Sequence, residues 1–168
     1  ILTVTRISEE TGTISKTPEA AEEIISEAVM KFRRRYDVPV EITIPDELML
    51  IPMDAILIEQ VIVNLLENSV LHGKTTTLIK LTLSSDGENA VFSVADNGSG
   101  INEKKLPMLF SGYFIHAEEQ SGDVKRNMGI GLSVCLTIIK AHGGTMTAGN
   151  LPEGGAEFTF TLPLERAL

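Results

Sequence analysis

The stretch TLIKLTLSSDGENAVFSVAD, residues 77–96, decides the fold because apolar and polar residues alternate in both of its halves. Such alternation is typical of strands with one buried face, and Ser85-Asp86-Gly87 between the halves has the composition of a tight turn. The stretch therefore predicts an antiparallel β-hairpin.

Helical patterns lie on both sides of this hairpin. Thr17-Pro18-Glu19 is typical of a helix start, and apolar residues follow at helical spacing as far as Phe32. The longest helical pattern covers residues 54–72, with Asp54 as its expected N-cap. A further helix is expected from about 130 to 142, where glycines end it.

Strand patterns complete the expected domain. VEITIPDELMLIP, residues 40–52, is typical of two short strands, and TMTAGN with AEFTFTLP predicts a last hairpin around residues 152–155. Three main helices interleaved with mostly antiparallel strands predict an α/β fold in which the helices pack on one face of a sheet.

The length and composition are those of one globular domain, and the charge argues against a nucleic-acid partner. The chain has 168 residues, 43% of them hydrophobic, and its formal charge is −9, which argues against nucleic-acid binding. The single Cys135 indicates a reducing compartment, and no apolar run approaches the roughly 18 residues of a membrane span. Because the chain begins at Ile1 and residues 1–16 resemble a linker, we expect a piece of a longer protein.

The longest helix carries the first group of candidate functional residues. In QVIVNLLENSVLHG, residues 60–73, Asn64 and Asn68 are four apart and share one face, with Glu67 beside them and His72 one turn on. Buried amides need partners. They either bond to loops that cross the helix or line a pocket where Asn68 offers an oxygen to a hard cation, and the residues alone leave both readings open.

The second group is VADNGSGINE, residues 94–103, which fits a tight turn, a metal loop or a nucleotide site. The calcium-loop pattern fails because Gly98 stands where an oxygen ligand is needed, and the dinucleotide pattern fails at Glu103. The apolar Ile101 and a following helix, in place of a partner strand, weigh against a plain hairpin turn. The interpretation that remains is a carboxylate, Asp96, at the end of a strand, followed by glycines that let the backbone approach a flat ligand.

The third group is NMGIGLSV, residues 127–134, where Gly129 and Gly131 are expected at a helix start. Free N–H groups there favour phosphate, and Lys125 and Arg126 directly precede the motif. The alternative to phosphate binding is that these two cations are ordinary solvent-exposed surface residues.

In their order along the chain, these motifs resemble those of the ATP-binding catalytic domain of sensor histidine kinases, within the superfamily that includes gyrase, Hsp90 and MutL. QVIVNLLENSVLHG resembles the N box, DNGSGI and GIGLSV the two glycine boxes, and LFSGYF the phenylalanine box. The resemblance covers residues 17–164, and IIKAHGGTMTAGNLPEGGAEFTFTLP is similar to the KdpD type of potassium-responsive sensor kinase. It implies a two-layer α/β sandwich, with about three helices on a mixed, mostly antiparallel sheet of about five strands.

The resemblance also implies roles for individual residues. Asp96 would hydrogen-bond the adenine amino group, and Asn68 would hold Mg²⁺ against the phosphates of ATP. Residues 110–127 would form a mobile lid. The implied catalytic residues are Asn64, Glu67 and Lys125. The nucleotide would be lined by Asn64, Asn68, His72, Asp96, Gly98, Gly100, Ile101, Phe110, Lys125, Arg126, Gly129, Gly131 and Leu132.

A histidine kinase also needs a phospho-acceptor histidine on a dimerisation helix, and none of His72, His116 or His142 lies in such a segment. The resemblance therefore implies that residues 17–168 donate the γ-phosphoryl group of ATP to a dimerisation domain outside this chain, for onward transfer to a response regulator. Residues 1–16 would be the end of that domain and its linker. The whole protein would be a homodimeric, membrane-anchored bacterial sensor, with this domain in the cytoplasm and making no direct membrane contact.

Three positions depart from the family pattern. Leu71 stands where many relatives carry a lysine, Asn127 replaces the first glycine of the second glycine box, and Asn64 stands where superfamily ATPases carry a glutamate base. An amide cannot take a proton from water, so we expect poor ATP hydrolysis by this chain alone. Leu71 and Asn127 leave open a second interpretation, a degenerate nucleotide-binding module that regulates by conformation without catalysis.

Overall fold

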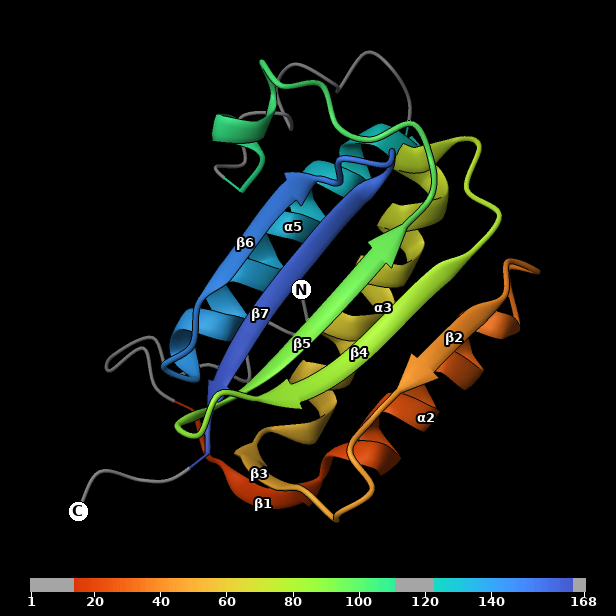
Figure 1. Cartoon of the computed structure of the whole chain (residues 1–168). Coiled ribbons are helices and arrows are strands. Elements are labelled where there is room, and N and C mark those ends of the chain that lie inside the picture. Colours follow the sequence, from red (N-terminus) through yellow and green to blue (C-terminus); the bar gives the residue numbers. More distant parts are fainter. Residues whose placement is uncertain (1–13, 111–122, 165–168) are drawn as a thin grey trace.

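The described part of the chain forms two layers, a five-stranded mixed sheet with three long helices on one of its faces (Figure 1). This computed structural model describes residues 14–110 and 123–164, with the backbone alone for 123–130. In spatial order the strands of the main sheet are β2 (Val40–Thr43), β4 (Ile79–Ser85), β5 (Asn89–Asp96), β7 (Ala156–Pro163) and β6 (Met146–Asn150). The helices are α2 (Ala21–Arg33), α3 (Ala55–Gly73) and α5 (Asp123–Ala141), with a 3-10 turn, η1, at Leu106–Met108. The predicted sandwich is confirmed.

The hairpin of β4 and β5 forms as predicted. In its turn the Asp86 carboxylate accepts hydrogen bonds from the backbone N–H groups of Glu88 (3.0 Å) and Asn89 (2.8 Å). The bonds from Asn89 and Glu88 lower the pKa of Asp86. Gly87 has a φ of +98°, a conformation that glycine adopts without a steric penalty. The turn is therefore defined by its own residues.

The two short strands predicted in residues 40–52 exist, but they belong to different sheets. β2 runs parallel to β4 at the edge of the main sheet, with Val40 opposite Ile79. Parallel neighbours need a crossover connection, which here contains α3. β3 (Leu50–Met53) instead pairs antiparallel with β1 (Thr17–Ala20) in a separate two-stranded sheet.

The predicted helix start at Thr17 is wrong, because Thr17–Ala20 form β1 and α2 begins at Ala21. The extended segment gains backbone hydrogen bonds to β3. Pro18 is tolerated because each strand of a two-stranded sheet has a free edge, where the missing N–H is not needed. Tertiary pairing therefore outweighs the local threonine and proline signals.

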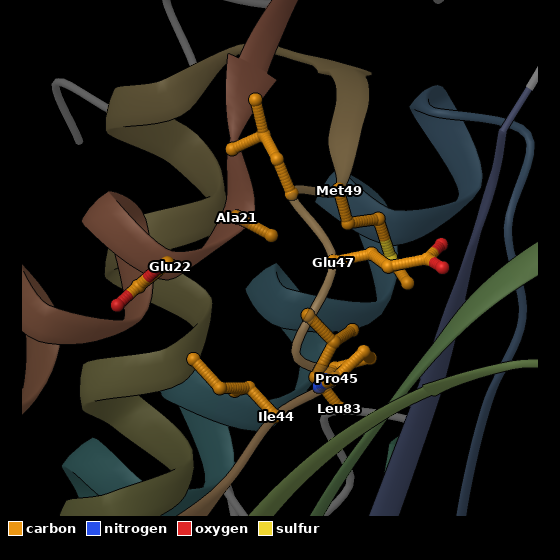
Figure 2. Close-up of a pocket in the computed structure, with 8 residues that line it drawn as sticks. Ala21, Glu22, Ile44, Pro45, Glu47, Met49 and Leu83 are labelled. Atoms are coloured by element: carbon orange, nitrogen blue, oxygen red, sulfur yellow. The ribbon is translucent and has the colours of Figure 1, made fainter.

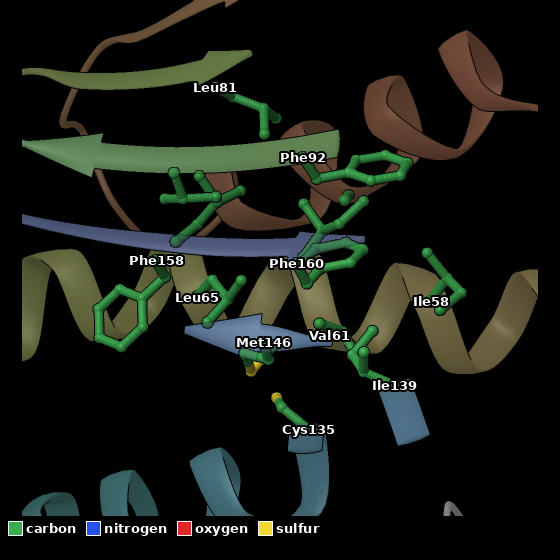
Figure 3. Packing of buried hydrophobic residues seen from close by; sticks show 14 of the residues in the cluster. Ile58, Val61, Leu65, Leu81, Phe92, Cys135, Ile139, Met146, Phe158 and Phe160 are labelled. Atoms are coloured by element: carbon green, nitrogen blue, oxygen red, sulfur yellow. The ribbon is translucent and has the colours of Figure 1, made fainter. Parts of the chain in front are cut away.

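The core lies between α3 and the sheet. In Figure 3, Val61 and Leu65 of α3 belong to the same buried cluster as Phe92 and Phe160 of the sheet. The two phenylalanine rings stack with their centroids 4.5 Å apart. Burying one large apolar side chain contributes about 1.5–3 kcal/mol, so this cluster holds α3 firmly in place over the middle of the sheet.

α3 is apolar over most of its surface. Contrary to the sequence-based expectation, its 19 residues are long and apolar enough, by length and composition alone, to cross a membrane. A central helix of a globular core passes the same test. In the described structure α3 packs against α2, α5 and the sheet, and its buried apolar side chains belong to the core cluster. Asp54 caps its first turn as predicted, accepting a hydrogen bond from the Leu57 N–H group (3.1 Å).

His142 joins the end of α5 to the beginning of α3. Its buried ring places Nδ1 2.8 Å from the carbonyl oxygen of Ile138, and its Nε2 accepts a hydrogen bond from the Asp54 N–H group (3.1 Å). Both bonds form when the ring is neutral and carries its proton on Nδ1. Burial lowers the pKa of His142 and Lys16 lowers it further, while the Ile138 carbonyl and the Asp54 carboxylate oppose the shift.

We expect the free energy of unfolding to fall as the pH drops below about 6.5, the ordinary pKa of histidine. The folded-state pKa of His142 lies below the unfolded one, so the unfolded chain binds the proton first and acid favours unfolding. Urea unfolding at about pH 7.5 and about pH 5.5 measures the effect. His142→Gln keeps an acceptor without titrating, so this variant should show a flatter dependence. Equal losses in both proteins would assign the effect to other groups.

Candidate functional site

Three of the predicted motifs meet at one end of the molecule (Figure 1). β5 and α3 both run towards this end, and α5 starts there and runs away from it. A strand terminus, a helix terminus and a helix start therefore lie close together. Free N–H groups at a helix start favour anionic ligands.

Asp96 is the last residue of β5 and is only 6% exposed. Its Oδ1 atom accepts hydrogen bonds from the backbone N–H groups of Gly98 (2.8 Å) and Ala156 (3.2 Å). Its Oδ2 atom accepts none from any residue in the described ranges. Because a buried acceptor without a donor is unfavourable, this oxygen is suited to receive an N–H group from a ligand.

The loop after Asp96 packs closely on the end of α3. A Cβ atom at Gly98 would overlap the Thr76 hydroxyl and lie 2.7 Å from the Cα atom of Gly73. Gly100 has a φ of +79°, which side chains rarely adopt. The glycines that were expected to admit a flat ligand are therefore also required for packing within the protein.

Two residues of the β6–β7 hairpin hold this loop, and sequence analysis did not identify either. Asn150, the last residue of β6, accepts a hydrogen bond from the Ile101 N–H group and donates one to the Ile101 carbonyl, both at 2.7 Å. Ala156 opens β7 and donates to Asp96. Asn150 precedes a turn in the sequence, so only its long-range pairing reveals this role.

Asn68 is buried on α3 without a hydrogen-bond partner among the residues that the structure describes. It is 4% exposed, so its amide oxygen is removed from bulk water. An unpaired buried amide costs about 1–3 kcal/mol. A bond from Asn68 to a crossing loop is not seen among the described residues, and its contact with a cation stays a prediction.

Asn64 lies where α3 meets α5. Its Nδ2 atom is 3.6 Å from the sulfur of Cys135, and a Cβ atom at Gly131 would be 3.7 Å from its Oδ1 atom. Burial raises the pKa of Cys135 to about 12, and the hydrogen bond from Asn64 opposes this shift. Cys135 is therefore an inert core residue, and Gly131 lies beside Asn64 where α3 meets α5, with room for a Cβ atom at ordinary contact distance.

Glu67, a predicted catalytic residue, is engaged elsewhere. Its Oε2 atom forms an ion pair with Nη1 of Arg35 at 3.1 Å, just beyond the end of α2, and its side chain is 18% exposed. This contact ties α3 to α2, so the structure gives Glu67 a structural role. Its catalytic role stays a prediction, as does a nucleotide contact of the half-buried His72.

α5 starts earlier than predicted, at Asp123 instead of about 130. The sequence at this start has an acidic residue, Asp123, which is a residue type preferred in the first turn of a helix, and the lysine, arginine and methionine that follow are good helix formers. These preferences outweigh the cost of two helical glycines, about 1 kcal/mol each. Gly129 and Gly131 therefore lie inside the helix and not at its start.

The free N–H groups of α5 consequently belong to residues 123–126, which include Lys125 and Arg126. These cations belong to the first turn of the helix and not to a preceding loop. Phosphate binding by Gly129, Gly131 and the buried Leu132 stays a prediction.

The predicted lid, residues 110–127, falls largely outside the described residues. Phe110 is half-buried and packs against the core, and residues 123–127 belong to α5. Residues 111–122, including Phe114 of the phenylalanine box, are not described.

A separate small pocket lies between the start of α2 and the segment that joins β2 to β3 (Figure 2). It is lined by Ala21, Glu22, Ile44, Pro45, Glu47, Leu48, Met49 and Leu83. None of the predicted site residues is among them, so this pocket is distinct from the candidate site.

With this geometry established, comparison with known proteins identifies the class. Residues 53–166 match the family of histidine kinase-, DNA gyrase B- and HSP90-like ATPases, and the chain belongs to this family. It is the ATP-binding catalytic domain of a two-component sensor histidine kinase.

Among its relatives are two proteins named sensor protein KdpD. The chain is 35% identical over 166 residues to KdpD of Clostridium acetobutylicum and 33% identical over 167 residues to KdpD of Escherichia coli K12. These alignments cover 98% and 99% of this chain but 18% of each relative. The chain therefore spans less than a fifth of the length of these curated relatives.

Solved structures agree with the assignment. The catalytic domain of histidine kinase ThkA is 26% identical, with a TM-score of 0.73 over 90% of this chain and 97% of that one. Full-length ShkA in complex with AMPPNP is 25% identical, with a TM-score of 0.72 over 91% of this chain and 32% of that one.

Proposed function

We propose that the chain binds Mg-ATP at the end of the molecule where β5, α3 and α5 meet, and donates the γ-phosphoryl group to a histidine of a dimerisation domain outside this chain. The observation that carries the proposal is the buried Asp96 carboxylate. One of its oxygens accepts two backbone hydrogen bonds, and the other has no donor within the described residues. The exocyclic amino group of adenine would supply that donor.

Asn68 supports the phosphate end of the proposed site. Its buried amide oxygen fits Mg²⁺, which prefers oxygen ligands and takes few of them from the protein when phosphates supply others. In the described ranges no group of three or more His, Cys, Asp or Glu side chains is placed to hold a metal ion. The ion would neutralise charge on the phosphates during transfer.

The start of α5 supports anion binding in an acidic protein. The chain carries a formal charge of −9, so the phosphates need a local source of positive potential. The first turn of α5 offers free backbone N–H groups, and Lys125 and Arg126 belong to it. We propose that these two residues neutralise charge on the phosphates. Proteins catalyse phosphoryl transfer mainly by positioning the reactants and neutralising this charge.

Asn64 supports transfer to histidine in preference to water. Its amide touches Cys135 and cannot remove a proton from an attacking water molecule. Glu67 is paired with Arg35, which competes with a role as base. We therefore expect slow ATP hydrolysis by the chain alone.

The test is to mix the chain with a separately produced dimerisation domain of a KdpD-type sensor and ATP labelled at the γ-phosphate. Transfer to the acceptor histidine of that domain, dependent on Mg²⁺, is the expected result. Tight ATP binding without transfer to any supplied acceptor would favour a degenerate regulatory module, the alternative that Leu71 and Asn127 suggest. Steady phosphate release by the chain alone would favour a self-contained ATPase.

The proposed context is a potassium-responsive, membrane-anchored sensor that is a homodimer, with this domain in the cytoplasm and a response regulator as the final acceptor. Identities of 35% and 33% to two KdpD proteins support it. A hybrid E. coli KdpD in which this chain replaces the corresponding part should keep the potassium response of that sensor. Loss of the response despite normal phosphoryl transfer would argue for a different stimulus.

A further inference from the structure

We propose that Asn150 is a positioning residue for nucleotide binding, and that the β6–β7 hairpin sets the geometry of the adenine site by holding both ends of the loop between Asp96 and Ile101. The inference rests on the proposed ATP site, but it concerns a residue outside all of its motifs.

The Asn150 side chain acts as a strand partner for Ile101. Its amide presents one acceptor and one donor to the N–H and carbonyl groups of the same residue, and both bonds measure 2.7 Å. Ile101 belongs to no strand, yet its side chain is only 4% exposed. Within the described chain, Asn150 is the hydrogen-bond partner of both backbone groups of Ile101.

The other end of the loop is held by the facing strand. Ala156 donates its N–H group to Asp96 Oδ1 at 3.2 Å, which leaves Oδ2 available. Gly155 brings its backbone so close to the Asp96 carbonyl oxygen that a Cβ atom there would overlap it. The loop is therefore held at Asp96 by β7 and at Ile101 by β6.

These two contacts are coupled by the register of the hairpin. Asn150 and Ala156 are directly opposite each other in the β6–β7 pairing. One cross-strand pair therefore fixes the separation between Asp96, which would bind the amino group of the base, and Ile101, which would line the base. A binding loop that is held in its bound conformation loses less entropy when the ligand arrives.

If Asn150 had a purely structural role, its removal would weaken the whole sheet. A positioning role predicts a different result. Asn150 is exposed, and within the described chain both hydrogen bonds of its side chain go to Ile101 and none to the core. Its removal should therefore loosen the loop and leave the sheet intact. The variant should lose nucleotide affinity because its contacts to the base are weakened. This loss of affinity should not depend on the number of phosphates.

The experiment compares Asn150→Ala with the unaltered chain by calorimetric titration with ADP and with a non-hydrolysable ATP analogue. Both affinities should fall by the same factor, about tenfold, the effect expected for two lost hydrogen bonds. Asn150→Asp keeps the acceptor for the Ile101 N–H group but turns a second acceptor toward the Ile101 carbonyl, so both affinities should fall in this variant too. Thr147→Ala, an exposed change in the same strand without a contact to the loop, should bind normally.

Amide hydrogen exchange separates a loosened loop from a weakened fold. In Asn150→Ala the Ile101 amide should exchange faster, while the amides of β5 and β7 keep their protection. Faster exchange throughout the sheet would overturn the inference. So would affinities within twofold of the unaltered chain, or a loss confined to the ATP analogue.

A variant of Asp96 distinguishes failure of this inference from failure of the proposed function. If Asp96→Asn prevents nucleotide binding and Asn150→Ala binds normally, the adenine site stands and the role of Asn150 is wrong. If Asp96→Asn binds nucleotide normally, the adenine site itself is misplaced, and the inference fails with it.

Discussion

The Asp96→Asn variant should bind ATP about 100-fold more weakly or not measurably. The change keeps Oδ1 as an acceptor for the Gly98 and Ala156 N–H groups, so the loop retains its contacts. It replaces the available Oδ2 atom by an NH₂ group, which would face the amino group of adenine donor to donor. Losing a hydrogen bond to a charged acceptor costs about 1.5–3 kcal/mol, and burying unpaired donors adds to this.

Asp96→Ala is a less informative variant. It would also remove the acceptor from two backbone N–H groups, one of them the buried N–H of Ala156. A loss of binding would then mix a lost ligand contact with a disturbed loop. Asparagine separates the two effects because it preserves the shape and one oxygen.

Calorimetric titration with Mg²⁺ and a non-hydrolysable ATP analogue measures the affinity. Asp86→Asn is the matched control, since it makes the same chemical change in the turn at the other end of the β4–β5 hairpin. It should leave the affinity unchanged. Normal binding by Asp96→Asn would show that the base does not contact this carboxylate.

The Asn68→Ala variant should transfer phosphoryl groups about 100- to 1000-fold more slowly, the scale seen when one preorganised electrostatic contact is removed. The proposed reason is loss of the protein oxygen that holds Mg²⁺ against the phosphates. The same change should leave stability unchanged or raise it. Asn68 is buried without a partner in the described structure, so alanine removes an unsatisfied polar group.

Labelling of the separate dimerisation domain measures the transfer rate, and thermal unfolding measures stability. Asn68→Asp keeps an oxygen ligand and should recover part of the activity. Ile56→Ala changes an exposed residue in the first turn of the same helix, so it controls for changes in α3 and should transfer normally. An unchanged rate in Asn68→Ala would rule out the magnesium role, and a large loss of stability would show that the amide has a structural partner.

The elements predicted correctly are those whose signals are local. Alternation and turn residues define the β4–β5 hairpin, and Asp54 with the apolar run behind it defines α3. The predictions are wrong where contacts with residues distant in the sequence determine the local structure. Thr17–Ala20 has a helix-start sequence but pairs with β3, whose partner residues lie 30 to 36 positions further along the chain.

The candidate site shows the same division. Asp96 and Asn68 could be selected from the sequence, because a strand-end carboxylate and a polar residue on an apolar helix are unusual in their local setting. The available oxygen of Asp96 and the partner of Glu67 depend on contacts with Ala156 and Arg35. Asn150 could not be found at all, since its role comes from pairing with a residue 49 positions away.

Among the described residues, the parallel strand β2 has a strand partner on one side only, and unpaired strand edges invite pairing between molecules. The strand is only four residues long, it carries the charged Glu41, and Pro39 and Pro45 flank it closely. Proline has no N–H group to donate, so a second strand would find few backbone partners there. The shortness of β2, its charged residue and the flanking prolines therefore all disfavour edge-to-edge aggregation.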